Sequence, residues 1–142
     1  MPVRKGFAVW EGSIREGRGS VSLESGLFEG PYSFSTRFEN AMGTNPEELI
    51  GAAHAGCFSM AFAGVLGQKG TPPRKIETTA EVRIDPEGAG FRIVSSALST
   101  TADVPGISEE DFHRAADEAK ANCPVSKALT GVKISLEAQL RK

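Results

Sequence analysis

The sequence predicts an α+β fold, with antiparallel sheets before and after one long, buried central helix. Three observations lead to this prediction. Residues 49–66 are almost continuously apolar and follow a helix-start signal at residues 45–48. Residues 75–84 and 132–140 alternate strictly between apolar and polar side chains, which is typical of half-buried strands. A chain of 142 residues can bury the core of one domain, so we expect a single domain over residues 1–142.

The residues before the long helix predict an antiparallel meander of three short strands. Residues 3–11 are expected to form the first strand, and a glycine-rich turn follows it. Apolar and polar side chains then alternate around Val21 and Leu23, which predicts the second strand. Tyr32 and Phe34 indicate the third strand, from which the chain is expected to lead through a loop into the helix.

The long helix has a clear start signal and is apolar on all sides. Asn45 can cap it, Pro46 suits its first turn, and Glu48 stands three residues after the cap. Only two side chains farther along, His54 and Ser59, are polar. A helix of this kind is normally enclosed by protein. Because one sheet covers only one face, we expect a second copy of the chain to cover the rest, in an obligate homodimer.

A transmembrane helix is the alternative interpretation of this apolar run. Its length only just reaches the ~18 residues that indicate a membrane span. Its many alanines and glycines are weak membrane inserters, and a histidine lies near its centre. We therefore expect no membrane association, and we interpret the small residues as positions where another helix or a sheet approaches closely.

The residues after the long helix predict a β-hairpin first. The hairpin pairs residues 75–84 with residues 91–102, across a turn at residues 85–88. The alternation of the second strand slips near Ser95 and Ser96, which indicates a β-bulge.

Two helices and a last strand are expected to complete the chain. Ser108 can cap a helix with acidic residues in its first turn, where the helix dipole favours them. This helix should end near Asn122, because Pro124 disfavours helical geometry at the residue before it. Cys123 can begin a second, short helix, and residues 132–140 form the final strand.

Charge and composition exclude several classes of function. A net charge of −2 and a pI near 5.7 argue against nucleic acid binding, which usually needs a basic face. No positively charged start precedes an apolar run, so no secretory signal is expected. Two cysteines without such a signal do not indicate an extracellular disulfide framework, and in a reducing cytosol they are more often buried bystanders, ligands or redox groups. The two cysteines and two histidines lack the paired spacing of a zinc site, so we expect no metal and no cofactor.

Cys57, in the middle of the long helix, is the first candidate for chemistry. A free cysteine in such a helix can simply be a small, buried, inert side chain. To act as a nucleophile near neutral pH, its pKa must fall, although burial raises it. A nearby guanidinium can lower it. Arg37 is the candidate because it precedes the helix. On charge alone, three other arginines stay open as alternatives: Arg4, Arg15 and Arg18.

Cys123 and three other residues have both a structural and a functional interpretation. Cys123 stands at a predicted helix start, where a thiolate is favoured. His54 is expected to be a satisfied core or interface histidine rather than a ligand or base. Glu47 and Glu48 can be first-turn carboxylates that match the helix dipole, and we accept this interpretation for Glu48.

Four segments of the chain resemble one protein family closely. They are residues 10–12, 36–39, 43–61 and 122–129. These segments resemble the osmotically inducible protein C (OsmC) family, which is related to the organic hydroperoxide resistance (Ohr) proteins. The resemblance covers nearly the whole chain in order, and the His-Ala-Gly-Cys sequence that ends at Cys57 is closer to the OsmC branch.

The resemblance implies an OsmC-like fold in intertwined homodimers and a cytosolic bacterial thiol peroxidase. In the family, the cysteine that matches Cys57 attacks the peroxide, and the one that matches Cys123 resolves the oxidised form. The arginine and glutamate that match Arg37 and Glu47 hold the thiolate. The family uses no cofactor, and an external dithiol, such as a lipoyl-protein, would reduce the disulfide.

Helix geometry adds a condition on Glu47. Ten residues separate it from Cys57, which corresponds to ~15 Å along one helix. Glu47 therefore cannot reach the thiol of its own helix. Two long helices that cross antiparallel in a dimer could bring Glu47 of one copy toward Cys57 of the other, with an arginine between them.

The function expected from these features is a thiol-dependent peroxidase for oxidative and osmotic stress defence. It would reduce organic hydroperoxides to alcohols through a Cys57 sulfenic acid and a Cys57–Cys123 disulfide. An apolar lining of Phe38, Phe58 and Met60 would favour alkyl or lipid hydroperoxides over hydrogen peroxide. The alternatives are a redox sensor that oxidises once, and a ligand-binding stress protein in which Cys57 is inert.

Overall fold

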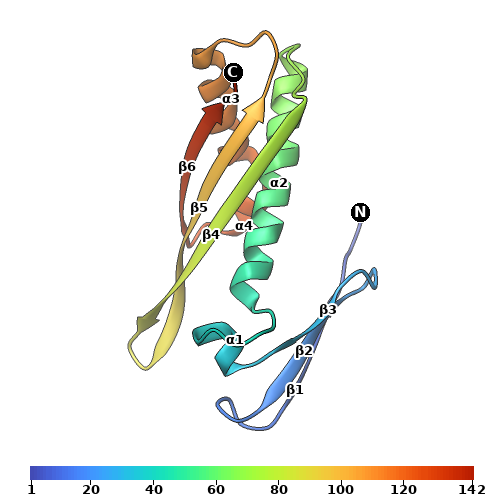
Figure 1. Ribbon diagram of the computed structural model, residues 1–142, viewed down its shortest axis with the longest axis vertical. Helices are drawn as coiled ribbons and strands as arrows, with labels where there is room; N and C mark the ends of the chain where they lie inside the picture. The colour runs from blue at the N-terminus through green and yellow to red at the C-terminus, as the bar shows by residue number, and fades with distance from the viewer. The chain divides into compact units, whose positions relative to one another are not determined.

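The computed structural model describes all residues from 1 to 142, and the chain divides into two compact units, residues 1–49 and 50–142. Each unit contains one three-stranded sheet (Figure 1). The long helix α2 (Pro46–Gln68) starts at the end of the first unit and continues through the second. The α+β class, with strands before and after one long helix, is confirmed. One domain over residues 1–142 stays a prediction.

The N-terminal unit is an antiparallel meander, as the sequence predicts. Its sheet has the order β1 (Gly6–Glu11), β2 (Arg18–Leu23) and β3 (Glu29–Tyr32). The predicted third strand is too long, because Phe34 does not belong to it. Phe34 is the first residue of a short helix, α1 (Phe34–Phe38), where a loop was expected.

Ser33 explains why a helix forms at this position. The backbone N–H of Thr36 donates to the Ser33 hydroxyl at 3.3 Å, and the N–H of Ser33 donates to the Thr36 hydroxyl at 2.7 Å. This reciprocal pair satisfies two N–H groups that a helix start leaves free. It stops the strand at Tyr32 and places Arg37 within the helix that follows.

Asn45 caps α2 as predicted. Its Oδ1 accepts the backbone N–H of Glu48 at 2.8 Å. The carboxylate of Glu48 does not return to Asn45 but accepts the Thr44 hydroxyl at 2.7 Å, so only half of the expected capping box forms.

One face of α2 is buried within the chain, and the other faces outward. His54, Phe58, Phe62 and Leu66 are fully buried and recur every four residues. The opposite face carries small side chains around Met60, which is 79% exposed. By length and apolar composition, α2 could cross a membrane, although the core helix of a soluble protein can have the same length and composition. Within the chain, 28% of its apolar 18-residue stretch is buried.

The second sheet has the order β4 (Lys75–Glu87), β5 (Gly90–Asp103) and β6 (Lys133–Leu140). Strands β4 and β5 form the predicted hairpin, but β6 runs parallel to β5, where an antiparallel strand was expected. The reason is the connection between them. Helices α3 (Glu109–Asn122) and α4 (Pro124–Ala128) separate β5 from β6, and such a crossover returns the chain in the same direction.

The hairpin also turns later than the sequence predicts. Strand β4 continues through Asp85, which pairs with Arg92, and the turn falls at Gly88, whose φ of +57° suits glycine. The predicted bulge is confirmed within one or two residues. The register shifts where Arg83 pairs with Ser95 and Ile84 with Ile93, leaving one extra residue in β5.

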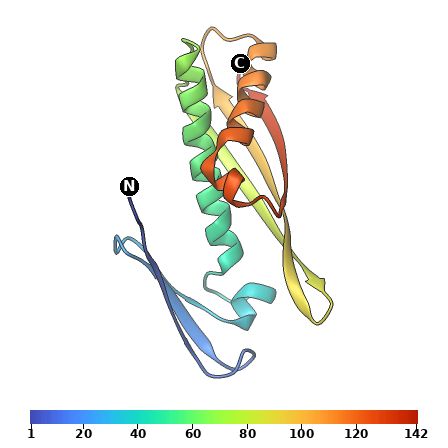
Figure 2. The ribbon, with the colours of Figure 1, turned by 180° about the vertical axis from the view of Figure 1, so that it is seen from behind.

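Helices α2 and α3 cover the same face of the second sheet (Figures 1 and 2). The close approach of α2 explains one glycine, since a Cβ on Gly51 would lie 3.0 Å from the Ala80 carbonyl oxygen of β4. Alternate residues of β4 and β6 point into this layer, as the strict sequence pattern predicts. The buried apolar core consists of Phe58, Phe62, Leu66, Leu98, Ala102, Val104, Phe112, Ala115, Ala116, Ala119 and Cys123.

Candidate active site

Two of the predicted site residues, Arg37 and Glu47, form an ion pair within the N-terminal unit. Arg37 lies on α1 and Glu47 in the first turn of α2. The Nε of Arg37 donates to Oε1 of Glu47 at 2.8 Å. The Glu47 side chain is only 9% exposed, whereas 35% of the Arg37 side chain stays accessible. Glu47 therefore holds the guanidinium in one orientation and leaves part of it free to meet a ligand.

A pocket of about 300 Å³ lies beside this guanidinium in the same unit. The Arg37 Cζ stands 5.3 Å from the centre of the Phe38 ring, which also lines the pocket. Most of the lining is aromatic or aliphatic, so the pocket suits an apolar group next to one positive charge. Its lining residues are Trp10, Ile14, Tyr32, Ser33, Phe34, Arg37 and Phe38.

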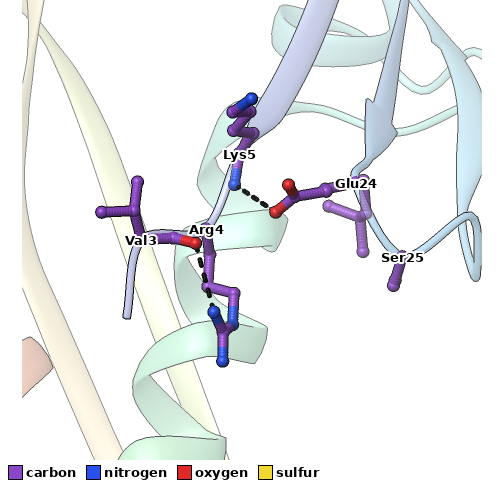
Figure 3. Close-up of a pocket in the computed structure, with 6 residues that line it drawn as sticks. Val3, Arg4, Lys5, Glu24 and Ser25 are labelled. Carbon is purple, nitrogen blue, oxygen red and sulfur yellow. Dashed lines mark hydrogen bonds between the residues drawn. The ribbon is translucent and has the colours of Figure 1, made fainter. Parts of the chain in front are cut away.

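Other arginines near the N-terminus make different contacts. Arg4 lines the pocket drawn in Figure 3, where its Nη1 donates to the Val3 carbonyl at 3.1 Å. The Cζ of Arg15 lies 4.5 Å from the centre of the Phe34 ring. Of the arginines that the sequence leaves open as partners of the thiol, Arg37 is the one with an ion pair to Glu47.

The two cysteines, Cys57 and Cys123, meet within the C-terminal unit. Both are free thiols, and a hydrogen bond joins their side chains. Cys57 lies on α2 and is partly buried, while Cys123 stands at the N-cap position of α4 and is fully buried. The packing of α3 against α2 brings them together, because Cys123 follows directly after the last residue of α3.

The surroundings set the two thiols apart in acidity. Burial raises the pKa of Cys57, and the hydrogen bond to Cys123 raises it further, against a smaller opposite effect of the Val125 backbone. Burial also raises the pKa of Cys123, but the hydrogen bonds from Cys57, from the backbone and hydroxyl of Ser126 and from the Val125 backbone lower it overall.

Both directions can be compared with what the sequence predicts. The lowered pKa of Cys123 agrees with a thiol at a helix start. The raised pKa of Cys57 is what burial alone predicts, so the lower pKa that a nucleophile needs is not reached in the single chain. None of the groups that shift the pKa of Cys57 is positively charged, so a reactive Cys57 needs a positive charge from elsewhere. Arg37, the candidate, belongs to the N-terminal unit.

His54 is a fully buried histidine whose two ring nitrogens are both hydrogen-bonded, as the sequence interpretation of a satisfied core residue requires. Its Nδ1 lies 2.7 Å from the Ser96 hydroxyl on β5, and its Nε2 lies 2.9 Å from the Ser126 hydroxyl on α4. Burial lowers the pKa of His54, so the ring is neutral near pH 7.

Sequence reasoning missed both of these serines. Ser126 had a detectable signal, because it stands three residues after Cys123 in the first turn of a predicted helix, where a hydroxyl can turn back to the cap. Ser96 had none beyond its position at the bulge, since a serine in an alternating strand is most often exposed.

Phe58 does not have its predicted role as a lining residue. It is fully buried, and its ring packs on Phe62 at a centroid distance of 5.5 Å. Phe62 in turn packs on Phe112 of α3 at 5.4 Å. Four-residue spacing from His54 turns Phe58 toward the core, while Met60 points outward. Of the three predicted lining residues, Phe38 is the one that lines a pocket beside Arg37.

Comparison with known proteins identifies the family of the chain. The sequence model of the family described as OsmC-like protein matches residues 39–137. Peroxiredoxin OsmC of Escherichia coli is 52% identical over 139 residues, which cover 97% of this chain and 96% of that protein. The chain belongs to the OsmC-like family. Organic hydroperoxide resistance protein-like 1 of Staphylococcus saprophyticus is more distant, at 35% identity over 63% of each chain.

Solved structures of OsmC and Ohr proteins have the same fold. An organic hydroperoxide resistance protein OsmC from Legionella pneumophila superposes with a TM-score of 0.73, at 22% identity, over 98% of this chain and 99% of that one. OhrB of Bacillus subtilis gives a TM-score of 0.72, at 21% identity, over 95% and 98% of the two chains. These similarities confirm the OsmC-like fold that the sequence motifs imply.

Proposed function

We propose that this OsmC-like protein is a thiol peroxidase that reduces organic hydroperoxides to alcohols in oxidative and osmotic stress defence. One observation carries the proposal: two free thiols, far apart in the sequence, are hydrogen-bonded to each other inside the C-terminal unit. Two thiols that are neighbours in this way are candidates for a disulfide. The similarity to a protein named peroxiredoxin, at 52% identity over nearly the full length, supports the same activity.

The proposed cycle has three steps. The Cys57 thiolate attacks the outer peroxide oxygen, the O–O bond breaks, and Cys57 becomes a sulfenic acid while an alkoxide leaves and takes up a proton from water to give the alcohol. The Cys123 thiolate then attacks the Cys57 sulfur, which forms the disulfide and releases hydroxide, later protonated to water. An external dithiol, such as a lipoyl-protein, reduces the disulfide by thiol–disulfide exchange and restores both thiols.

A homodimer would complete the site. The outward face of α2 is lined with small residues, and a Cβ on Gly56 or Gly64 would have no neighbour within 4 Å. Two such faces can pack closely, which would cover Met60 and remove this apolar surface from water. In the proposed intertwined homodimer, the Arg37–Glu47 pair of one protomer stands beside Cys57 of its partner.

In this arrangement, Arg37 has two proposed tasks. Its positive charge lowers the pKa of Cys57 against the effect of burial, and it stabilises the charge that develops on the leaving oxygen. Glu47 alone would raise the pKa of the thiol, so its task is to orient the guanidinium. The Oε2 of Glu47 is buried and accepts no hydrogen bond, so it can also accept one from an incoming group.

The pocket beside Arg37 supports organic peroxides as the substrate class. Its apolar lining favours an alkyl or lipid chain over the small and polar hydrogen peroxide. We therefore expect a higher kcat/KM for cumene hydroperoxide than for hydrogen peroxide. The reverse order would contradict this assignment of the pocket. A cytoplasmic location is proposed because the cycle depends on reduced thiols.

Trapping the sulfenic acid tests the proposal. Wild-type protein, Cys57→Ser and Cys123→Ser each receive one equivalent of cumene hydroperoxide in the presence of dimedone. The adduct should form on Cys57, accumulate most in Cys123→Ser, and be absent from Cys57→Ser. Repeated turnover with excess dithiol separates a peroxidase from a redox sensor, which would oxidise once and stop. An unreactive Cys57 would favour the ligand-binding alternative.

A further inference from the structure

The resolving cysteine is connected to a buried histidine through one hydroxyl. Ser126 is hydrogen-bonded to Cys123 through its side chain, and the same hydroxyl lies 2.9 Å from Nε2 of His54. The other ring nitrogen lies 2.7 Å from the Ser96 hydroxyl. All four side chains are buried, with exposed fractions between 0% and 7%. Cys123, Ser126, His54 and Ser96 therefore form one continuous chain of hydrogen bonds, called here the thiol–histidine path.

This path joins three separate elements at the reacting sulfur. His54 comes from α2, Ser96 from β5 and Ser126 from α4. A histidine that serves packing alone needs only to have its two nitrogens satisfied. Here the hydroxyl that satisfies Nε2 is also the one that contacts Cys123, so the ring can exchange a proton with the thiol through a single intermediate oxygen.

We propose that Ser126 and His54 relay the proton of Cys123 and thereby prepare it for attack on oxidised Cys57. The inference rests on the proposed function, because it assigns a task to the resolving step. Ser126 touches the reacting thiol, whereas His54 acts through Ser126 and is a positioning residue. The relay requires the tautomer in which Nδ1–H donates to the Ser96 hydroxyl, 2.7 Å away, so that Nε2 is free to accept a proton.

The proton balance of this step is closed. As the Cys123 sulfur approaches Cys57, its proton passes to the Ser126 oxygen, and the Ser126 proton passes to Nε2 of His54. The Cys123 electron pair forms the S–S bond, the S–O bond of the sulfenic acid breaks, and hydroxide leaves with the S–O electrons. His54 then returns its proton through Ser126, and the hydroxide takes it up as water. Cys57 sulfur is reduced, Cys123 sulfur is oxidised, and no further reactant is needed.

Few charged groups can interfere with this path. From Ile93 to Ala102, β5 carries no charged side chain, and from Ile50 to Leu66 the only titratable groups of α2 are His54 and Cys57. Close to Cys123 in the sequence, α3 and α4 carry Lys120, which is partly buried, and Lys127, which is exposed. Ser96 pairs with Val82 of β4 and Ile134 of β6, and the charged residues beside these two, Glu81, Arg83 and Lys133, are exposed. The two thiols and the imidazole are therefore the groups that set the protonation of the path.

The first test follows disulfide formation after one equivalent of cumene hydroperoxide, in wild type, Ser126→Ala and His54→Gln. The matched control is Ser59→Ala. This substitution removes a hydroxyl from α2, the helix of His54, but that hydroxyl donates to Thr78 and lies outside the thiol–histidine path. At pH 7 we expect Ser126→Ala and His54→Gln to form the disulfide at least ~10-fold more slowly than wild type, because the loss of a general base slows a reaction by at least about this factor. The sulfenic acid should form at the wild-type rate in all four proteins.

The pH profile separates a relay from a structural role. At a pH high enough to ionise Cys123 unaided, the two path variants should regain the wild-type rate of disulfide formation. A defect of the same size at every pH would indicate altered packing and overturn the proposal, as would a wild-type rate at pH 7. If the wild type forms no sulfenic acid, the proposed function fails, and the relay is then judged by the next measurement alone.

The second test needs no peroxide and works on single-thiol protein. In a Cys57→Ala background, the pKa of Cys123 is measured from thiolate absorbance, with and without Ser126→Ala or His54→Gln. Both path variants should raise the pKa of Cys123, and Ser59→Ala should leave it unchanged. An unchanged pKa in a variant that keeps the wild-type melting temperature would overturn the relay. Should His54→Gln fail to fold, Ser126→Ala decides alone.

Discussion

Arg37 and Glu47 lie ten residues apart in the sequence and meet in one ion pair of 2.8 Å. The capped helix α1 turns the chain between them, so their contact depends on Ser33 as well as on themselves. The sequence favours Arg37 because it precedes the long helix, but charge alone leaves four arginines open, and only the family resemblance joins Arg37 to Glu47. What decides among them is side-chain geometry, which charge counts do not contain.

Replacing Arg37 tests its effect on the thiol. Arg37→Met should raise the pKa of Cys57 and slow sulfenic acid formation at pH 7 by at least ~10-fold, because burial then acts without compensation. Arg37→Lys should recover only part of the rate, since an ammonium cannot keep the planar contact with Glu47. Stopped-flow measurement of peroxide consumption reports the rate. Arg74→Met, at an exposed ion pair with Asp103, is the control and should behave as wild type.

His54 predicts how stability depends on pH. Its folded-state pKa lies below the ordinary value of 6.5 because of burial, so between these two values the unfolded chain binds more protons. Stability is therefore fully present above about pH 6.5 and is lost as the pH falls toward the folded-state pKa of His54.

Urea unfolding at fixed protein concentration measures this effect. For the wild type, the urea concentration at the transition midpoint should decrease when the pH is lowered from 7.5 to 5.5. The decrease should be smaller for His54→Gln. An equal fall in both proteins would show that other groups cause the loss.

At the scale of elements, the sequence predicts the buried faces of the strands better than it predicts where elements begin, end and turn. The strict alternation of β4 and β6 correctly predicts which of their side chains are buried. For α2, which is apolar on all sides in the sequence, the pattern does not indicate that the face of His54, Phe58 and Phe62 is the one buried within the chain. Turns and strand directions were predicted less well. Ser33 starts a helix where Phe34 suggests a strand, β4 continues past Asp85, and β6 is parallel because of the crossover through α3 and α4. These outcomes depend on capping and long-range pairing, which a local pattern does not contain.

Phe62 tests the core between α2, α3 and the second sheet. It is fully buried and its ring packs against both Phe58 and Phe112. Phe62→Ala should lower the free energy of unfolding by about 3–5 kcal/mol, because it leaves a cavity as well as losing buried surface. Leu27→Ala, at a side chain that is 88% exposed, should change it by less than about 0.5 kcal/mol. Denaturant titration of both variants gives the comparison.

At the scale of the whole molecule, the residues of the proposed site lie in two different units. The C-terminal unit joins the two thiols, and the N-terminal unit joins Arg37 to Glu47. The helix between them is apolar on a face that the chain itself leaves exposed, around Met60. In the proposed homodimer, a second copy of the chain would cover this face and supply the positive charge that a reactive Cys57 needs.

Mixed dimers test whether the site combines two protomers. Arg37→Met and Cys57→Ser should each be nearly inactive as homodimers. In a heterodimer of the two, one site would contain an intact Cys57 from the first protomer and an intact Arg37 from the second. Unfolding and refolding an equal mixture should therefore restore peroxidase activity, measured with cumene hydroperoxide and a dithiol. Continued inactivity in purified heterodimers would place Arg37 and Cys57 in the same protomer.

The proposed cycle depends on the pairing of the two cysteines, which peptide mapping after one equivalent of cumene hydroperoxide can establish. We expect one disulfide between Cys57 and Cys123 of the same chain, together with one equivalent of alcohol. Peptides that still carry two free thiols, or that are joined only through cysteines of different chains, would contradict it.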